Sequence, residues 1–299
     1  MTFVVRPGMN ARAIAGELVN AGILPHPWYF AALVHQRNAS RRLKSGEYRI
    51  RPGSMMATVI DDLVNGNVVQ HPVTLVEGWT FGEFRHALES ARAIVNSLKG
   101  LDDAEVMRRL GHDGKHPEGR FFPDTYHVTL GTTDVELLTR AHGRMAKELG
   151  EAWAAREPDL PYQSPDEALV MASIIEKETA AGVERPLIAG VFVRRLLQGM
   201  KLQTDPTVIY GLGHDFDGNL TRGHLEQDGP YNTYRRSGLP PTPIAMPGRE
   251  SILAALHPAG GDALYFVARG DGSHEFSATL EQHNAAVARF QKRTPKETR

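Results

Sequence analysis

The chain has 299 residues, of which 41% are hydrophobic and 23% are charged. These fractions are typical of a globular protein, and the length is sufficient for two domains and a sizeable core. The 34 basic and 35 acidic residues give a net charge of −1, and no run of basic residues occurs, so no nucleic-acid partner is indicated. The absence of cysteine excludes disulfides, thiol catalysis and zinc–thiolate sites.

The apolar segments of the chain are all short. No run of about 18 apolar residues occurs, so the sequence predicts neither a transmembrane helix nor a signal peptide within it. Residues 3–5 already have the composition of a strand, at the very start of the chain. A domain that begins in a strand suggests that an upstream piece has been cut off, and we expect an apolar segment there.

Residues 1–72 are predicted to form a small first domain. The pattern of apolar and turn residues predicts a strand, two helices, a strand and a third helix in the ranges 3–5, 11–22, 28–37, 46–50 and 55–64. Small strand–helix–helix–strand units often bind ligands. This unit could equally serve only to support the next domain.

Residues 73–299 are predicted to form the second domain. A strand at 73–78 and a helical region over 83–111 precede a loop at 116–126 that is rich in aromatic and acidic residues, and a helix at 134–155 follows. Loops of this composition line many sugar and peptide clefts, because rings stack on apolar sugar faces and carboxylates accept hydroxyl protons. Such loops also serve simply as packing, and the sequence leaves both interpretations open.

The centre of this domain is predicted to be a helix that starts after Ser164 and ends near residue 182. Ser164, Pro165 and Glu167 have the spacing of an N-cap, a first-turn proline and a capping box. A nearly continuous apolar run then leads into Glu176 and Glu178. Each glutamate continues a small or apolar stripe, so periodicity does not decide between them. Both could also lie in solvent at the helix end.

The last part of the chain alternates regular elements with one long loop. The pattern predicts a helix, an irregular loop, a helix, two strands and a final helix in the ranges 185–199, 211–247, 249–256, 264–268, 274–277 and 278–290. In the first of these helices, Arg194 and Arg195 are predicted to lie on a solvated face. The aromatic residues and prolines of the long loop favour a functional loop over a disordered one.

Several chemistries can be excluded. The chain has no G-x-S-x-G motif, no P-loop and no G-x-G-x-x-G after a strand. His112 and His116 have the spacing of a helical metal pair, but a glycine between them and a proline after them disrupt such a helix, and we expect no metal site. A hydrolase with two carboxylates stays open, in which the partner of Glu176 would be Glu118, Asp124 or Asp205.

A series of motifs is the strongest functional signal in the chain. They are SIIEKET at 173–179, LQTDPTVIYG at 202–211, YNTY at 231–234, GLPP at 238–241, and the shorter pieces Glu77-Gly78, Glu118-Gly119, Phe122–Tyr126 and Tyr265–Val267. In this order they resemble the MltG/YceG-like endolytic murein transglycosylases. The resemblance spans nearly the whole chain.

The resemblance implies an α+β fold, in which a small LysM-like domain at 1–72 precedes a mixed α/β catalytic domain at 73–299 with a long, loop-lined cleft. It implies peptidoglycan glycan strands as substrate, an association with peptidoglycan synthases, and no cofactor. It also implies an N-terminal anchor, absent from this chain, with a single pass through the inner or plasma membrane. The catalytic domain would face the periplasm or cell wall, and this chain would be the soluble portion.

By resemblance, Glu176 is the catalytic acid and base. The enzyme would cleave the β-1,4 bond between N-acetylmuramic acid and N-acetylglucosamine within strands, leaving 1,6-anhydro ends and limiting or ending the elongation of new strands. One residue can serve in both roles because the first step leaves it ionised. Glu178 is expected to give structural or electrostatic support. The expected substrate-binding residues are Glu118, Tyr126, Gln203, Asp205, Tyr231 and Asn232.

Two other functions stay open. One is a non-catalytic peptidoglycan-binding or scaffold protein with the LysM-like unit as its active part, although Glu176 and the long aromatic loop argue against it. The other is a pyridoxal phosphate lyase, a label sometimes given to this family, which would need a Schiff-base lysine and a phosphate cradle. Lys177 is the only lysine within a motif, and no glycine-rich phosphate loop accompanies it.

Overall fold

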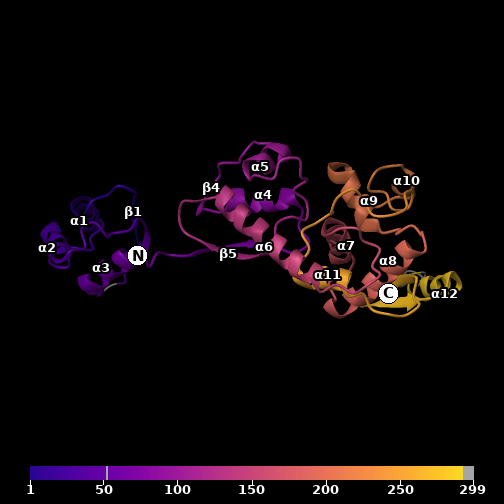
Figure 1. Ribbon diagram of the computed structural model, residues 1–299. Helices are drawn as coiled ribbons and strands as arrows, with labels where there is room; N and C mark the ends of the chain where they lie inside the picture. Colours follow the sequence, from indigo (N-terminus) through magenta and orange to yellow (C-terminus); the bar gives the residue numbers. More distant parts are fainter. Residues whose placement is uncertain (52, 292–299) are drawn as a thin grey trace, which may run out of the picture. The chain divides into compact units, whose positions relative to one another are not determined.

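The computed structural model describes residues 1–51 and 53–291, which fall into two compact units (Figure 1). The first unit holds residues 1–73 with two later segments, 88–99 and 125–137, and the second unit holds the remaining described residues. Helices are combined with small two-stranded sheets, so the predicted mixture of α and β structure is confirmed. The division of the chain into functional domains at residue 72 stays a prediction. Residue 52 and residues 292–299 of these predicted domains lie outside the described residues.

The first unit begins with the predicted order of strand, helix, helix and strand. The elements are β1 (Thr2–Val5), α1 (Ala11–Asn20), α2 (Pro27–Gln36), β2 (Gly46–Arg49) and then α3 (Met56–Asn65). β1 and β2 are antiparallel, with Phe3 opposite Tyr48. Asn10 starts α1, because its side chain accepts a 2.9 Å hydrogen bond from the N–H of Ala13. The core between these elements contains Ile14, Leu18, Phe30 and Ile60. The likeness to a LysM domain stays a prediction.

The region predicted as helical from 83 to 111 is divided into two helices and a strand. α4 (Phe81–Ser90) ends before β4 (Ile94–Val95), and α5 (Asp103–Arg109) begins after it. β4 pairs in parallel with β6 (Thr132–Thr133), a tertiary pairing that a local pattern does not reveal. Asp102 then starts a separate helix, because its side chain accepts a 2.8 Å hydrogen bond from the N–H of Glu105. The prediction of one helical region is therefore wrong.

From residue 134 onward the chain is mainly helical. The longer elements are α6 (Asp134–Ala154), α7 (Pro165–Glu178), α8 (Arg185–Leu197), α9 (Asp205–Leu212), α10 (Arg222–Glu226), α11 (Arg249–Leu256), β7 (Tyr265–Ala268), β8 (His274–Ser277) and α12 (Leu280–Phe290). β7 and β8 are antiparallel, and β3 (His71–Leu75) pairs with β5 (Asp124–Val128). Among the described helices, none combines the length and the apolar character needed to cross a lipid bilayer.

α7 is the central helix of the second unit, and α8, α9 and α11 pack against it (Figure 1). Residues 168–175 are all buried, which explains why their sequence is an apolar run rather than an amphipathic pattern. Ser164 caps the first turn as predicted, since its hydroxyl accepts a hydrogen bond from the N–H of Glu167. The helix ends at Glu178, before the predicted end at residue 182. Glu176 and Glu178 therefore lie in its last turn.

Candidate active site

Glu176 is held at the end of α7 by two hydrogen-bond donors from outside the helix. Arg185 donates from Nη2 to Oε1 over 3.1 Å, and the backbone N–H of Gly248 donates to Oε2 over 2.9 Å. The side chain of Glu176 is only 6% exposed. The sequence leaves open whether this glutamate lies in solvent, and the structure shows it covered and fixed in one orientation.

Arg185 belongs to the candidate site, although its position in the sequence predicts only the start of a helix. It is the first residue of α8, and its side chain is 12% exposed. Besides its ion pair with Glu176, it has a buried Nε without a hydrogen-bond partner in the described part of the chain. No local pattern reveals the pair, because the turn between α7 and α8 brings the two side chains together.

The loop after β3 borders the same end of α7. Gly78 has a φ of +76°, a backbone conformation that favours glycine. Gly78 and Trp79 form two backbone hydrogen bonds with Met246. The N–H of Gly78 donates to the Met246 carbonyl over 2.8 Å, and the carbonyl of Trp79 accepts from the Met246 N–H over 2.7 Å. Lys177 donates from Nζ to the Gly78 carbonyl over 3.1 Å. These bonds hold Glu77, to which the sequence analysis assigns no role, beside the end of α7.

A hollow of about 490 Å³ lies at this end of α7. It is lined by Glu77, Gly78, Trp79, Glu176, Lys177, Glu178, Thr179, Ala180 and Arg185. Partial burial and the negative charge of Glu176 raise the pKa of Glu77, while the positive charge of Arg185 acts in the opposite direction. Several carboxyl groups and two cations around one open space are suited to acid–base chemistry.

Glu178 lines this hollow and also a second one of about 560 Å³. The hydroxyl of Thr204 donates a hydrogen bond to its carboxyl group. Burial raises the pKa of Glu178 to about 7, against the effect of that hydroxyl, and the negative charge of Asp205 adds to the rise. A substantial fraction of Glu178 therefore carries a proton at neutral pH.

Two predicted substrate-binding residues lie beside Glu178 in the second hollow. Gln203 is exposed, and its Oε1 accepts a 3.3 Å hydrogen bond from Arg195. Its backbone φ of +54° is uncommon for a residue other than glycine. Asp205 begins α9, and its Oδ1 accepts a 2.5 Å hydrogen bond from the hydroxyl of Tyr234. The structure thus brings Glu178, Gln203 and Asp205 together, while their binding of substrate stays a prediction.

The two arginines predicted on a solvated face of α8 are instead bonded to backbone carbonyl groups. Arg195 is 7% exposed and donates to the carbonyls of Lys201, Leu202 and Leu264. Arg194 is half-buried and donates to the carbonyls of Ala259 and Ala263. The prediction is wrong because these acceptors come from irregular segments that meet α8 only in the tertiary structure.

Tyr231 and Asn232 lie away from Glu176 in the long loop, at a small hollow of about 60 Å³. Asn232 is buried, and its Nδ2 donates to the carbonyls of His224, Leu225 and Gln227. The hydroxyl of Tyr231 is 2.8 Å from that of Thr242. Both side chains thus hold the loop in shape, and their contact with substrate stays a prediction.

Glu118 and Tyr126 are both buried. Glu118 accepts hydrogen bonds from the N–H of Phe81 (3.0 Å) and from the hydroxyl of Tyr210 (3.1 Å). Burial raises the pKa of Glu118 to about 7, although both hydrogen bonds lower it. Tyr126 lies on β5, in the part of that strand that belongs to the first unit. The structure does not bring Glu118 into the hollow at Glu176, and the predicted binding roles of both residues stay predictions.

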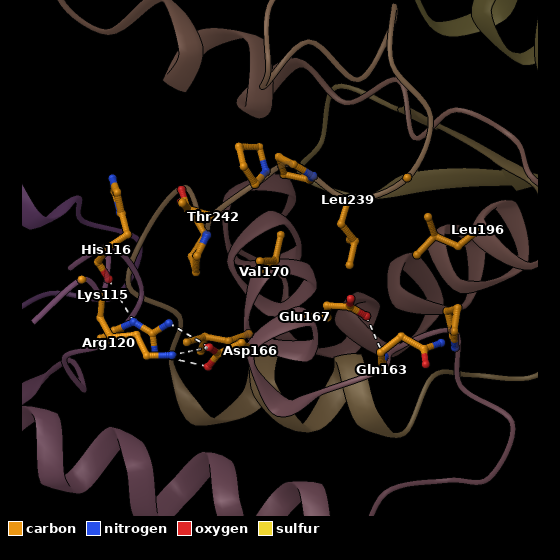
Figure 2. A pocket seen from close by; sticks show the side chains of 17 residues that line it. Lys115, His116, Arg120, Gln163, Asp166, Glu167, Val170, Leu196, Leu239 and Thr242 are labelled. Atoms are coloured by element: carbon orange, nitrogen blue, oxygen red, sulfur yellow. Dashed lines mark hydrogen bonds and ion pairs between the residues drawn. The ribbon is translucent and has the colours of Figure 1, made fainter. Parts of the chain in front are cut away.

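A larger hollow of about 650 Å³ lies against the N-terminal half of α7 (Figure 2). Val170 and Leu239 point into it, from α7 and from the loop that carries the GLPP motif (Figure 2). At its polar end Arg120 donates two hydrogen bonds, of 3.2 and 2.9 Å, to Asp166. Glu176 is not among its lining residues, so size alone does not identify the reactive site.

The sequence of this chain is similar to those of known proteins. The model of the YceG-like family matches residues 3–289. The chain belongs to the YceG-like family. An endolytic murein transglycosylase from Bacillus subtilis (strain 168) is 39% identical to this YceG-like chain over 198 residues, which are 66% of the chain and 54% of that relative. A protein of the same name from Streptococcus pneumoniae (serotype 2, strain D39) is 27% identical over 327 aligned positions, which cover 96% of the chain and 58% of the relative.

A solved structure shows the same fold. The crystal structure of a yceG-like protein from Listeria monocytogenes matches with a TM-score of 0.60 and 29% identity, over 95% of this chain and 98% of that one. The YceG-like chain spans little more than half the length of the two transglycosylases from Bacillus and Streptococcus. Their activity is therefore applied to it below as a proposal.

Proposed function

We propose that this YceG-like protein is an endolytic peptidoglycan lytic transglycosylase. It cuts the β-1,4 bond between N-acetylmuramic acid and N-acetylglucosamine inside glycan strands. The observation that supports this most directly is Glu176, a covered carboxyl group that Arg185 and Gly248 hold at an open hollow. The activity named for the Bacillus and Streptococcus relatives supports the same class of reaction.

Glu176 acts first as an acid and then as a base. Its proton passes to the glycosidic oxygen as the bond from that oxygen to C1 breaks. The carboxylate then takes the proton of the C6 hydroxyl of the same muramic acid residue, as the C6 oxygen bonds to C1. The product is a 1,6-anhydro end, no water is consumed, and Glu176 regains its proton. Because Arg185 and Gly248 fix the carboxyl group, little reorientation is needed on binding.

The other predicted site residues have supporting or substrate-binding roles in this proposal. Glu178 gives electrostatic support, and Gln203 and Asp205 bind sugar hydroxyl or acetamido groups in the second hollow, because both are exposed there. The other predicted binding residues are Glu118, Tyr126, Tyr231 and Asn232. Glu118 and Asn232 could contact substrate only if their present hydrogen bonds opened, since they are buried and already bonded.

The protein acts at the cell envelope in this proposal. Residues 1–72 form a LysM-like domain that binds glycan strands, and residues 73–299 form the catalytic domain, with the hollow at Glu176 as part of a longer cleft. A membrane anchor outside this chain holds the protein in the inner or plasma membrane, facing the periplasm or cell wall. Peptidoglycan synthases are its partners, and its cuts limit the length of new strands.

Mass spectrometry of purified glycan strands after incubation tests the reaction. The proteins compared are the wild type, Glu176→Gln and the control Glu151→Gln, which changes a glutamate whose side chain is 68% exposed on α6. We expect 1,6-anhydro ends from the wild type and from the control, and none from Glu176→Gln.

Two other results would contradict the proposal. New reducing ends in place of anhydro ends would mean hydrolysis by water, and a two-carboxylate mechanism would replace the one above. Binding of strands by the wild type without any cleavage would instead support the scaffold function.

A further inference from the structure

Of the two donors that bond to Glu176, Arg185 is a cation, and its charge opposes the protonated form that the proposed acid needs. An acid must carry a proton, whereas a guanidinium beside a carboxyl group stabilises its charged form. A second negative charge near Glu176 would offset the guanidinium of Arg185. The loop after β3 supplies such a charge in Glu77, and the following inference rests on the proposed transglycosylase reaction.

Glu77 and Glu176 border the same glycine. The N–H of Gly248 donates to Oε2 of Glu176 over 2.9 Å. A Cβ atom added to Gly248 would lie 2.1 Å from Oε1 and 2.7 Å from Oε2 of Glu77. The carboxyl group of Glu77 therefore fills the space that a side chain at position 248 would take. Since Gly248 has an ordinary φ of −76°, close approach of Glu77 rather than backbone conformation accounts for a glycine here.

More carboxyl groups than cations surround Glu77. Those that act on it are Glu176, Arg185 and Glu250, and Lys177 and Glu178 line the same hollow. Arg185 is already ion-paired with Glu176, so one guanidinium faces two carboxyl groups. Partial burial and the charge of Glu176 raise the pKa of Glu77, so the two carboxyl groups interact.

We propose that Glu77 and Glu176 form a coupled pair of carboxyl groups that holds one proton between them, and that Glu77 thereby keeps Glu176 able to act as the acid. With one proton, the pair and Arg185 are together neutral, the balance that a partly buried site favours. During the reaction the proton of Glu176 passes to the glycosidic oxygen, and the C6 hydroxyl proton returns to Glu176. Glu77 neither gains nor loses a proton over the cycle, and it acts through Glu176 as a positioning residue.

The pH profile of strand cleavage tests this role. Glu77→Gln keeps the size of the side chain and removes its charge, and we expect a roughly tenfold loss of kcat at neutral pH, since one unit of pKa is a factor of ten in the protonated fraction. The alkaline limb of the profile should move to lower pH by about one unit, because the remaining carboxyl group then loses its proton more readily beside Arg185. Glu77→Asp should restore most of the activity, and the exposed control Glu151→Gln should match the wild type.

A second measurement needs no substrate. The carboxyl carbon of Glu77 is followed by ¹³C NMR as pH is varied, in the wild type and in Glu176→Gln. We expect its titration midpoint to fall in the variant, because the charge of Glu176 that raises the pKa of Glu77 is gone.

The two measurements separate the inference from the proposed function. Equal midpoints in the two proteins would overturn the coupled pair, even if the wild type made anhydro ends. An activity loss in Glu77→Gln with an unchanged pH profile would also overturn it, since a merely structural role gives that result. A shifted midpoint in a wild type that makes no anhydro ends would uphold the pair and contradict the transglycosylase reaction alone.

Discussion

Glu176 and Glu118 are two covered carboxyl groups of the second unit that have different surroundings. Both are covered, with 6% of the side chain of Glu176 and 3% of the residue Glu118 exposed, and both accept two hydrogen bonds. The donors differ, because Glu176 has a guanidinium and a backbone N–H, whereas Glu118 has a phenol and a backbone N–H. Glu176 also borders an open hollow, and Glu118 lines none of those described above.

This difference indicates that burial and hydrogen bonds do not by themselves identify a catalytic carboxyl group. Glu118 joins the start of α4, through Phe81, to Tyr210 of α9. Its neutral donors do not outweigh burial, which raises its pKa to about 7. Glu118 therefore links α4 to α9 in this structure, while its predicted binding of substrate stays a prediction. Glu176 differs from it in having a charged donor and an open hollow beside it.

The largest expected effect separates the two glutamates by activity. Glu176→Gln should lower strand cleavage by about 10²–10⁴-fold without unfolding the protein, because it removes the acid and base. Glu118→Gln should keep most of the activity per folded molecule, measured by release of anhydro ends and by circular dichroism. An equal loss of activity in a well-folded Glu118→Gln would contradict this difference between the two glutamates and would indicate that Glu118 contacts the substrate.

The next effect is on stability as a function of pH. The pKa of Glu118 is raised from 4.5 to about 7, so between these values the folded chain binds a proton that the unfolded chain releases. The stabilisation that comes from this bound proton is fully present below pH 4.5 and is lost as pH rises through about 7. The free energy of unfolding should therefore fall by about 3 kcal/mol over this range. Urea unfolding at several pH values should show this fall in the wild type and a smaller one in Glu118→Gln. Glu178, whose pKa is also raised to about 7, contributes with the same sign and remains in the variant.

A smaller effect is expected at the glycine between the two carboxyl groups of the hollow. Gly248→Ala fits the backbone but places a methyl group where the Glu77 carboxyl lies, so this flexible side chain must move. We expect cleavage to fall about tenfold, since a displacement of about 1 Å near the chemistry is costly. Wild-type cleavage by Gly248→Ala would show that the position of Glu77 is unimportant.

The smallest effect concerns one donor of Glu118. Tyr210→Phe removes the hydroxyl that lowers the pKa of Glu118, so that pKa should rise further. The free energy of unfolding at neutral pH should fall by about 1 kcal/mol, the usual contribution of one hydrogen bond. Thermal unfolding and strand cleavage measured together should show a lower Tm with unchanged activity, whereas a changed activity would link Tyr210 to the reaction.

The sequence by itself determined the helix that carries the candidate site. Ser164, the proline after it and the apolar run to Ile175 are local signals, and they place Glu176 near the C-terminal end of this helix, although α7 ends at Glu178 rather than near residue 182. The order of strand, helix, helix and strand at the start was equally readable, because each element has its own period and its own turn. The spaced motifs indicated the family, which the match over residues 3–289 shows.

Only the tertiary structure decided what surrounds Glu176. Arg185 lies 9 residues away and Gly248 lies 72 residues away, while Lys177 reaches across 99 residues to the loop that carries Glu77. The same reason explains the errors, since β4 pairs with a distant strand and Arg195 bonds to carbonyls of other segments. Periodicity records whether one face of a segment is buried, but the partner of a charge is set by packing between segments, which a local pattern does not contain.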